Sequence, residues 1–308
     1  MYNLWKQIYR QLALAAAFHL PEADRIALER RLRGKEEARK LSFCDGVIVS
    51  YGKSGRTWLR VMLSRFYQRK YQLTTQQLLG FDNLHAKNPG VPKIFFTHDN
   101  YLKDYTGHTT TKEDYYHQRV LLLARDPRDI AVSQFFQWKF RMRPHKKKLN
   151  LYPPHESDIS LFDFVMHETA GLPKIIDFLN LWASEMPQIE RFLLVRYEDM
   201  RSDTAAELRR ITEFLGTPGS DELINDAVEF ATIDNMRKLE QEKKFWLSGS
   251  RMMPKDKNNP NSYKVRRAKV GGWRDYFDDD QVEQIDTLVN SRLHPVYQYS
   301  QPREVVNA

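Results

Sequence analysis

The chain has 308 residues, of which 41% are hydrophobic and 29% charged, and its formal net charge is +8 at pH 7. This composition is that of an ordinary globular protein, and the length suffices for one large domain with its own core. The single cysteine, Cys44, excludes an internal disulfide framework and favours a reducing compartment. The positive charge favours an anionic ligand or surface, and no zinc-finger or RNP-type signature points to nucleic acid as that partner.

The first 20 residues combine a basic start with the short apolar run LALAAAF. One helical face carries the larger apolar side chains, Leu4, Trp5, Ile8 and Leu12. We favour a helix packed on the domain, while contact with a membrane surface and a cleaved signal peptide stay open. The run is far shorter than the roughly 20 residues that span a bilayer.

A charged stretch follows, and Pro21 at its beginning suits a helix start. The stretch as far as Lys40 predicts a solvated helix. We therefore interpret residues 1–41 as an N-terminal helical extension and residues 42–300 as the main domain.

Four short, nearly continuous apolar runs come next: GVIVSY (46–51), KIFFTH (93–98), RVLLLAR (119–125) and RFLLVRY (191–197). Such runs are typical of buried parallel strands. Helical patterns follow three of them, at 58–67, 129–138 and 203–216. In the last pattern Thr204 and Glu207 have capping-box spacing, and Gly216 suits the position after the final turn. The alternation predicts an α/β fold, a three-layer parallel sheet flanked by helices.

Two segments are expected to be long mobile loops: RMRPHKKKLNLYPPHES (141–157) and SGSRMMPKDKNNPNSYK (248–264). The basic run of the first either attracts an anionic acceptor or, as we slightly favour, only solubilises the loop. The second precedes two arginines and predicts a lid that closes over a bound ligand. A loop that is always flexible and does not sense the site is the alternative.

Residues 51–58, YGKSGRTW, follow the first apolar run and contain Gly-Lys-Ser. An ATP-binding P-loop needs a glycine five residues before Gly52, and Val47 stands there. A strand, a glycine-rich turn and a helix start nevertheless form a concave set of backbone amides that suits a phosphate. Lys53 adds a point charge and Thr57 a hydroxyl. The pattern alone also fits a tight turn with a surface lysine.

The segment RVLLLARDPRDIAVSQFF places Arg125 at a strand end and Ser133 in the following helix, for which Asp126 and Pro127 are the expected N-cap and first residue. Arg125 and Ser133 can converge on one phosphate monoester, with the arginine binding through two hydrogen bonds. An ATPase would place an acid at this strand end for Mg²⁺, and Arg125 stands there instead. The sequence shows no cluster of metal ligands, so no metal is predicted.

On these residues the chain resembles the sulfotransferases that use 3′-phosphoadenosine 5′-phosphosulfate (PAPS), whose loop reads approximately Y-P-K-S-G-T-T-W. The resemblance covers roughly residues 45–280 and implies their P-loop NTPase-like fold. It implies that the 5′-phosphosulfate end and the adenine side are bound by Lys53, Ser54, Gly55, Arg56, Thr57 and Trp58. It also implies that Arg125 and Ser133 clamp the 3′-phosphate. Gly52 replaces the family's proline, and Arg56 replaces a threonine and brings a further cation.

Weaker parts of the resemblance imply further contacts with PAPS. They come from Arg266 and Arg267 in RRAKVGGWRDYF, from Tyr197 in VRYEDM and from Thr232 in ATIDNM. Ala268 stands where the family has glycine. Ile233 replaces an aromatic residue that stacks on adenine in the family.

His98 comes just after the second apolar run, where α/β sheets present residues that face ligands. An imidazole of near-neutral pKa can take the proton of an attacking hydroxyl. A lone histidine at a strand end is more often structural, but the resemblance matches Thr97-His98 to the family's K-T-H and makes His98 the general base. Phe96 stands where the family has lysine, so the role of that lysine passes to Lys53 or to another group.

The resemblance therefore implies a transferase that moves the sulfuryl group from PAPS to a hydroxyl, or with less help to an amine. We expect it to be cytoplasmic and metal-independent. His98 is the expected base, and Lys53 is expected to stabilise the leaving phosphate. The acceptor stays open among glycans, lipids and small alcohols or phenols. The alternatives are a small-molecule kinase, a nucleotide-binding protein without transfer activity and a basic nucleic-acid binder. Peripheral membrane contact through the N-terminal helix also stays open.

Overall fold

A computed structural model describes residues 2–242, 244–245, 256, 258–265 and 269–299. At its centre lies a parallel sheet of four strands, ordered β2-β1-β3-β4. The strands are β1 (Gly46–Val49), β2 (Ile94–Thr97), β3 (Arg119–Ala124) and β4 (Arg191–Arg196). Each lies within one of the four apolar runs, which extend one or two residues further. The predicted parallel sheet is confirmed.

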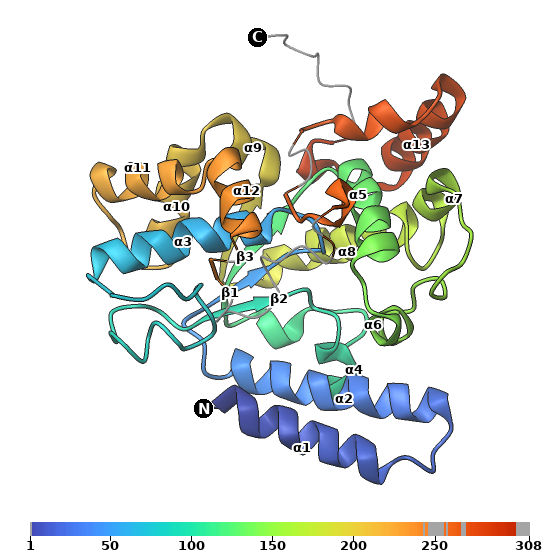
Figure 1. The fold of residues 1–308 in the computed structure, drawn as a ribbon, viewed down its shortest axis with the longest axis horizontal. Helices are drawn as coiled ribbons and strands as arrows, with labels where there is room; N and C mark the ends of the chain where they lie inside the picture. Colours follow the sequence, from blue (N-terminus) through green and yellow to red (C-terminus); the bar gives the residue numbers. More distant parts are fainter. Residues whose placement is uncertain (1, 243, 246–255, 257, 266–268, 300–308) are drawn as a thin grey trace.

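Helices cover both faces of this sheet (Figure 1). On one face α3 (Arg56–Lys70), α10 (Thr204–Phe214) and α11 (Asp221–Phe230) pack against the strands. On the other face lie α5 (Pro127–Phe140), α8 (Leu172–Glu185) and α13 (Asp279–Arg292). The shorter helices are α4 (Leu102–Thr106), α6 (Pro144–Leu149), α7 (Leu161–Met166), α9 (Tyr197–Ser202) and α12 (Ile233–Gln241).

The strands divide their side chains between two cores, as strand geometry requires. Val47 and Leu122 enter the core beneath α5 and α8, whereas Ile48 and Leu121 enter the core beneath α3 and α10. Because both faces are covered, almost every residue of β1 and β3 is buried. The structure therefore confirms the three-layer arrangement.

Two of the expected helix ends are confirmed and one is wrong. Asp126 caps α5 by accepting the backbone N–H of Arg128, and Gly216 follows α10 with a φ of 75°. The predicted capping box at Thr204 does not form, because Asp203 is the N-cap of α10 and accepts the N–H of Ala206. The hydroxyl of Thr204 instead donates to the carbonyl of Met200 in the preceding helix.

The N-terminal residues form α1 (Tyr2–Ala16) and α2 (Glu22–Leu41), which lie side by side at one end of the molecule (Figure 1). The expected solvated character of the second helix is wrong for one of its faces. Glu29 is buried, and a Cβ at Gly34 would lie 2.2 Å from the carbonyl oxygen of Tyr101, so the helix packs closely against the start of α4. Leu12, on the predicted apolar face of α1, is 65% exposed.

The division of the chain after residue 41 stays an interpretation. Among the described residues, no helix is long and apolar enough to cross a bilayer.

The first expected loop is partly helical, which corrects the sequence interpretation. Residues 144–149 form α6, and Lys147 is buried, with its Nζ 3.2 Å from Nδ1 of His155 and 4.5 Å from the ring centre of Trp138. At Lys147 the basic run is therefore part of the core and does not serve solubility. In the second expected loop, residues 248–255 and 257 lie outside the described residues, and so does most of the predicted lid. Its described end contains a short 3₁₀ turn, Pro260–Ser262.

Candidate functional site

A cavity of about 800 Å³ lies at the carboxyl ends of the strands. The residue or loop that follows each of the four strands contributes to its wall: Lys53 after β1, His98 after β2, Arg125 after β3 and Tyr197 after β4. This is where parallel α/β sheets bind ligands, because the loops at this edge converge. Four segments that are far apart in the sequence thus meet at one site.

The 51–58 loop lines the cavity through Gly52, Lys53, Gly55, Arg56, Thr57 and Trp58. Lys53 and Gly55 adopt positive φ angles of 74° and 91°, and Gly55 is the N-cap of α3. These turns bring the start of α3 to the cavity wall, as a phosphate loop requires. A Cβ at Gly55 would lie 2.5 Å from Cδ2 of Tyr197, so the tyrosine ring packs directly on the loop backbone.

The predicted adenine side of the loop is built around Trp58. Its Nε1 donates to the carbonyl of Ala231 at 2.8 Å, and its ring meets that of Tyr197 edge-on, with centres 5.8 Å apart. Ile233 lines the cavity beside them, where the family has an aromatic residue. Thr232 is exposed and does not line the cavity, so the structure does not bring it to the site.

Ser54 is not one of the residues that line the cavity. It is buried, and its hydroxyl has no hydrogen-bond partner among the described residues. Arg266 and Arg267, the other predicted contacts of the 3′-phosphate, lie outside the described residues.

Arg125 is buried and contacts several other residues of the site. Its guanidinium lies 4.4 Å from the ring centre of Tyr197, donates to the carbonyl of Lys53 at 3.1 Å, and pairs with Asp129 at 3.2 Å. Ser133, one helical turn after Asp129, lines the same cavity. The predicted pair is therefore brought together with the loop.

Asp129 was missed by the sequence interpretation. Besides pairing with Arg125, its carboxylate accepts the backbone N–H groups of Gly271 and Trp273 at 3.0 and 3.1 Å. Burial raises its pKa from the ordinary value. The i, i+4 spacing of Arg125 and Asp129 is the one signal in the sequence that was available for it.

The ring of His98 is held at both nitrogens. Nδ1 lies 2.7 Å from the carbonyl oxygen of Ser50, and Nε2 lies 2.6 Å from Nη2 of Arg56. Because a carbonyl only accepts, Nδ1 carries the proton and Nε2 presents its lone pair. Burial and then the charge of Arg56 hold the pKa of His98 well below its usual value, so the imidazole is neutral at neutral pH.

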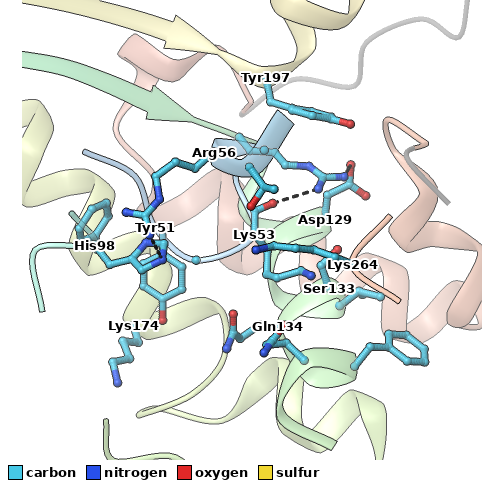
Figure 2. Close-up of a pocket in the computed structure, with 18 of the residues that line it drawn as sticks. Tyr51, Lys53, Arg56, His98, Asp129, Ser133, Gln134, Lys174, Tyr197 and Lys264 are labelled. Carbon is cyan, nitrogen blue, oxygen red and sulfur yellow. Dashed lines mark hydrogen bonds and ion pairs between the residues drawn. The ribbon is translucent and has the colours of Figure 1, made fainter. Parts of the chain in front are cut away.

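A further cation, Lys264, lines the cavity and was not predicted (Figure 2). Figure 2 shows its side chain beside those of Lys53 and Ser133. Burial, followed by the charges of Lys53, Arg141 and Arg56, lowers its pKa well below the ordinary value. Glu240 fixes this segment by accepting the N–H groups of Lys264 and Val265 at 2.7 and 3.1 Å.

Phe96 does not line the cavity. The guanidinium of Arg60 lies over its ring, 3.7 Å from the centre. The position where the resemblance expects a lysine therefore contributes no charge to the site, whereas Lys53 and Arg56 line the cavity. Together these cations make the cavity suited to a ligand that carries several negative charges.

Comparison with known proteins agrees with this geometry. The sulfotransferase domain model matches residues 44–296. Flavonol 3-sulfotransferase of Flaveria bidentis is 25% identical over 270 residues, covering 81% of each chain, and sulfotransferase 2A1 of Homo sapiens is 23% identical, covering 81% of this chain and 84% of that one. In structure, mouse sulfotransferase SULT7A1 complexed with PAP has a TM-score of 0.53 at 20% identity, covering 84% of this chain and 89% of that one. Retinol dehydratase in complex with retinol and PAP has a TM-score of 0.54 at 18% identity, covering 84% and 85%.

The chain belongs to the sulfotransferase domain family. Its fold is the one shared with these structures. The class of enzyme and its donor, PAPS, are thereby confirmed at the level of the family, as the sequence predicted.

Proposed function

We propose that this cavity transfers the sulfuryl group of PAPS to a hydroxyl of a small-molecule acceptor. The observation that carries the proposal is that the 51–58 loop, Arg125 with Ser133, and His98 all line one cavity. The loop suits the 5′-phosphosulfate, and Arg125 with Ser133 suits the 3′-phosphate, so the two anionic ends of PAPS have separate cationic sites. Tyr197 and Trp58 also line the cavity and provide ring surfaces for the nucleotide.

In the proposed reaction His98 removes the proton of the acceptor hydroxyl through Nε2. The hydroxyl oxygen attacks sulfur, the bond between sulfur and the bridging phosphate oxygen breaks, and PAP leaves with the electron pair of that bond. Lys53 and the backbone amides of the loop stabilise the charge on the leaving phosphate. Because the transfer depends mostly on positioning and charge, fixed cations can serve here as Mg²⁺ serves in kinases.

Arg56 has a second task in this scheme. In the structure its Nη2–H occupies the lone pair of Nε2, so it must release His98 before the base can act. The sulfuryl oxygens of bound PAPS are the natural new partners, since they carry negative charge close to the loop. Phe96 stands where the family has a lysine, and in this proposal Arg56 takes over part of that lysine's role.

The acceptor class and the compartment rest on the relatives. Their names describe sulfotransferases of flavonols and cytosolic sulfotransferases, and one neighbour holds retinol. We propose a small alcohol or phenol as acceptor and the cytosol as compartment, which the single cysteine supports. Contact of α1 with a membrane surface stays a prediction, as does the absence of a nucleic-acid partner.

Calorimetric titration with nucleotides tests the donor assignment. PAP should bind much more tightly than adenosine 5′-phosphosulfate, which lacks the 3′-phosphate, because each lost charged hydrogen bond costs about 1.5–3 kcal/mol. Ser133→Ala should weaken PAP and leave adenosine 5′-phosphosulfate nearly unchanged. Equal affinity for the two nucleotides would remove Arg125 and Ser133 from the site, and ATP turnover that requires Mg²⁺ would favour the kinase alternative.

A further inference from the structure

The cavity extends beyond His98 into a region that the proposed donor does not use. Its wall there includes Arg30 of α2, Lys103 of α4, Tyr152 and, from α8, Lys174 and Phe178. Figure 2 shows Lys174 on the same side of the site as His98 and Tyr51, away from Ser133, Tyr197 and Lys264. The proposed donor site leaves this side of His98 for an acceptor.

Lys174 is the unusual residue of this region. Its Nζ donates to the carbonyl oxygen of Asn150 at 2.9 Å and lies 5.1 Å from the ring centre of Tyr152. Within the described residues, that carbonyl and that ring are the partners of this ammonium, and no carboxylate is among the causes of its pKa shift. Burial, then the charges of Arg30 and Lys103, lower its pKa to about 8. A desolvated cation without a paired acid, facing two like charges, is costly unless an anion joins it.

The carboxylates that line this part of the cavity either pair with other cations or are exposed. Asp99 pairs with Lys112 at 2.6 Å and accepts the hydroxyl of Tyr115 at 2.9 Å. Asp177 pairs with Arg292 at 3.0 Å. Glu168 lines the cavity from an exposed position.

Arg30 pairs with Asp104, yet its charge still acts on Lys174. Lys103 is the second cation that lowers the pKa of Lys174.

Apolar surface adjoins this charge. Tyr51 and Phe178 line the cavity, and their rings meet edge-on with centres 5.4 Å apart. Figure 2 places Tyr51 next to His98. The acceptor side of the site thus presents a base, an aromatic surface and an unneutralised cation, which match a hydroxyl, an apolar body and an anion on one molecule.

We propose that the acceptor is a small hydroxylated amphiphile that also carries a carboxylate, bound by Lys174 with Arg30 and Lys103 contributing their charge. This inference rests on the proposed function and specifies its acceptor. The carboxylate replaces the carbonyl of Asn150 as the partner of Lys174, and the apolar body packs against Tyr51 and Phe178. The hydroxyl then lies toward His98.

Paired acceptors test this inference. Transfer of labelled sulfate from PAPS is measured for hydroxyaryl and hydroxysteroid carboxylates, each against its neutral methyl ester, for example 3-(4-hydroxyphenyl)propanoate and its ester. At least one acid should exceed its ester in kcat/KM by about 10- to 100-fold, the range expected for one charge-assisted hydrogen bond. Lys174→Met should remove most of that preference by raising KM for the acid.

Lys146→Met is the matched control. Lys146 is also desolvated, its pKa is likewise lowered to about 8, and it does not line the cavity. The preference for acids should survive this change. If esters are sulfated as well as acids, if no acid is sulfated although PAP binds, or if both variants lose the preference equally, the inference is wrong. Failure of PAP to bind would instead refute the proposed function.

Discussion

The guanidinium of Arg56 lies against the catalytic candidate His98, with Nη2 2.6 Å from Nε2. Since the other ring nitrogen donates to Ser50, the contact occupies the lone pair that would accept a proton. It also keeps the imidazole neutral, because a nearby cation disfavours the charged form. His98 is therefore in the neutral form that a base requires. Its lone pair stays occupied until Arg56 binds another group.

Arg56→Met should change the pH dependence of the reaction. The base must be neutral, so the rate falls as pH falls through the pKa of His98. In the wild type that pKa is well below its usual value, from burial first and Arg56 second, and activity should persist into acidic pH. Without Arg56 the pKa rises, and the acidic limb of kcat should move to higher pH. A limb that stays in place would show that Arg56 does not act on His98 during turnover.

Lys264 should link nucleotide binding to proton uptake. Its pKa is lowered in the free protein by burial and by Lys53, Arg141 and Arg56, and phosphate groups nearby would raise it again. At a pH above this lowered pKa, where the phosphates are already ionised, PAP binding should therefore take up protons and weaken as pH rises. Titrations in buffers of different ionisation enthalpy measure this uptake. Lys264→Met should lose most of it, and an unchanged uptake would place Lys264 away from the nucleotide.

Gly55 and Gly107 offer a controlled test of the loop geometry. Their φ angles are 91° and 88°, so alanine at either position should cost about 1–2 kcal/mol of stability through backbone strain. A Cβ at Gly107 meets nothing within 4 Å, whereas at Gly55 it would displace the Tyr197 ring. Gly55→Ala should therefore weaken PAP binding at least about tenfold, and Gly107→Ala should leave it near the wild-type value. Equal binding by both variants would mean that Tyr197 on the loop does not shape the donor site.

Glu37 of α2 should make stability depend on pH. Burial, and then Asp99, raise its pKa to about 7, while it accepts the hydroxyl of Thr97 and the N–H of Tyr101, both at 3.3 Å. The folded state thus holds this proton more tightly than the unfolded state, and stability is lost as pH rises from about 4.5 to about 7.

Glu37→Gln removes that loss, because a neutral amide has no proton to give up. Between pH 5 and pH 8, the unfolding free energy of the wild type should fall by roughly 2–3 kcal/mol relative to the variant. Urea unfolding at the two pH values measures the difference. Parallel pH dependence of the two proteins would show that Glu37 is ionised in the fold.

Sequence patterns predicted those features that depend on local order. Continuous apolar runs identified the strands, and glycine spacing identified the 51–58 loop, because both reflect neighbouring residues. The capping of α10 was misassigned by one residue, since Asp203 and Thr204 are both good N-caps. The burial of Lys147 was missed because its aromatic partner Trp138 comes from another helix.

Residues of the site that depend on long-range contacts were harder to find. Asp129 accepts hydrogen bonds from the distant residues Gly271 and Trp273. Lys264 is positioned because Glu240 accepts its backbone N–H. Lys174 faces Arg30 only because α2 packs beside the domain. Such contacts depend on the tertiary structure, and the spacing of residues within one segment does not reveal them.

The most direct measurement is single-turnover transfer of labelled sulfate from saturating PAPS, by the wild type and by His98→Ala. The account predicts that the variant is slower by about 10²- to 10⁴-fold with a hydroxyl acceptor. Its affinity for PAP should stay within about threefold of the wild type, which shows that the donor site is intact. A folded variant that binds PAP normally and keeps more than about a tenth of the wild-type rate would contradict the assignment of His98 as the base.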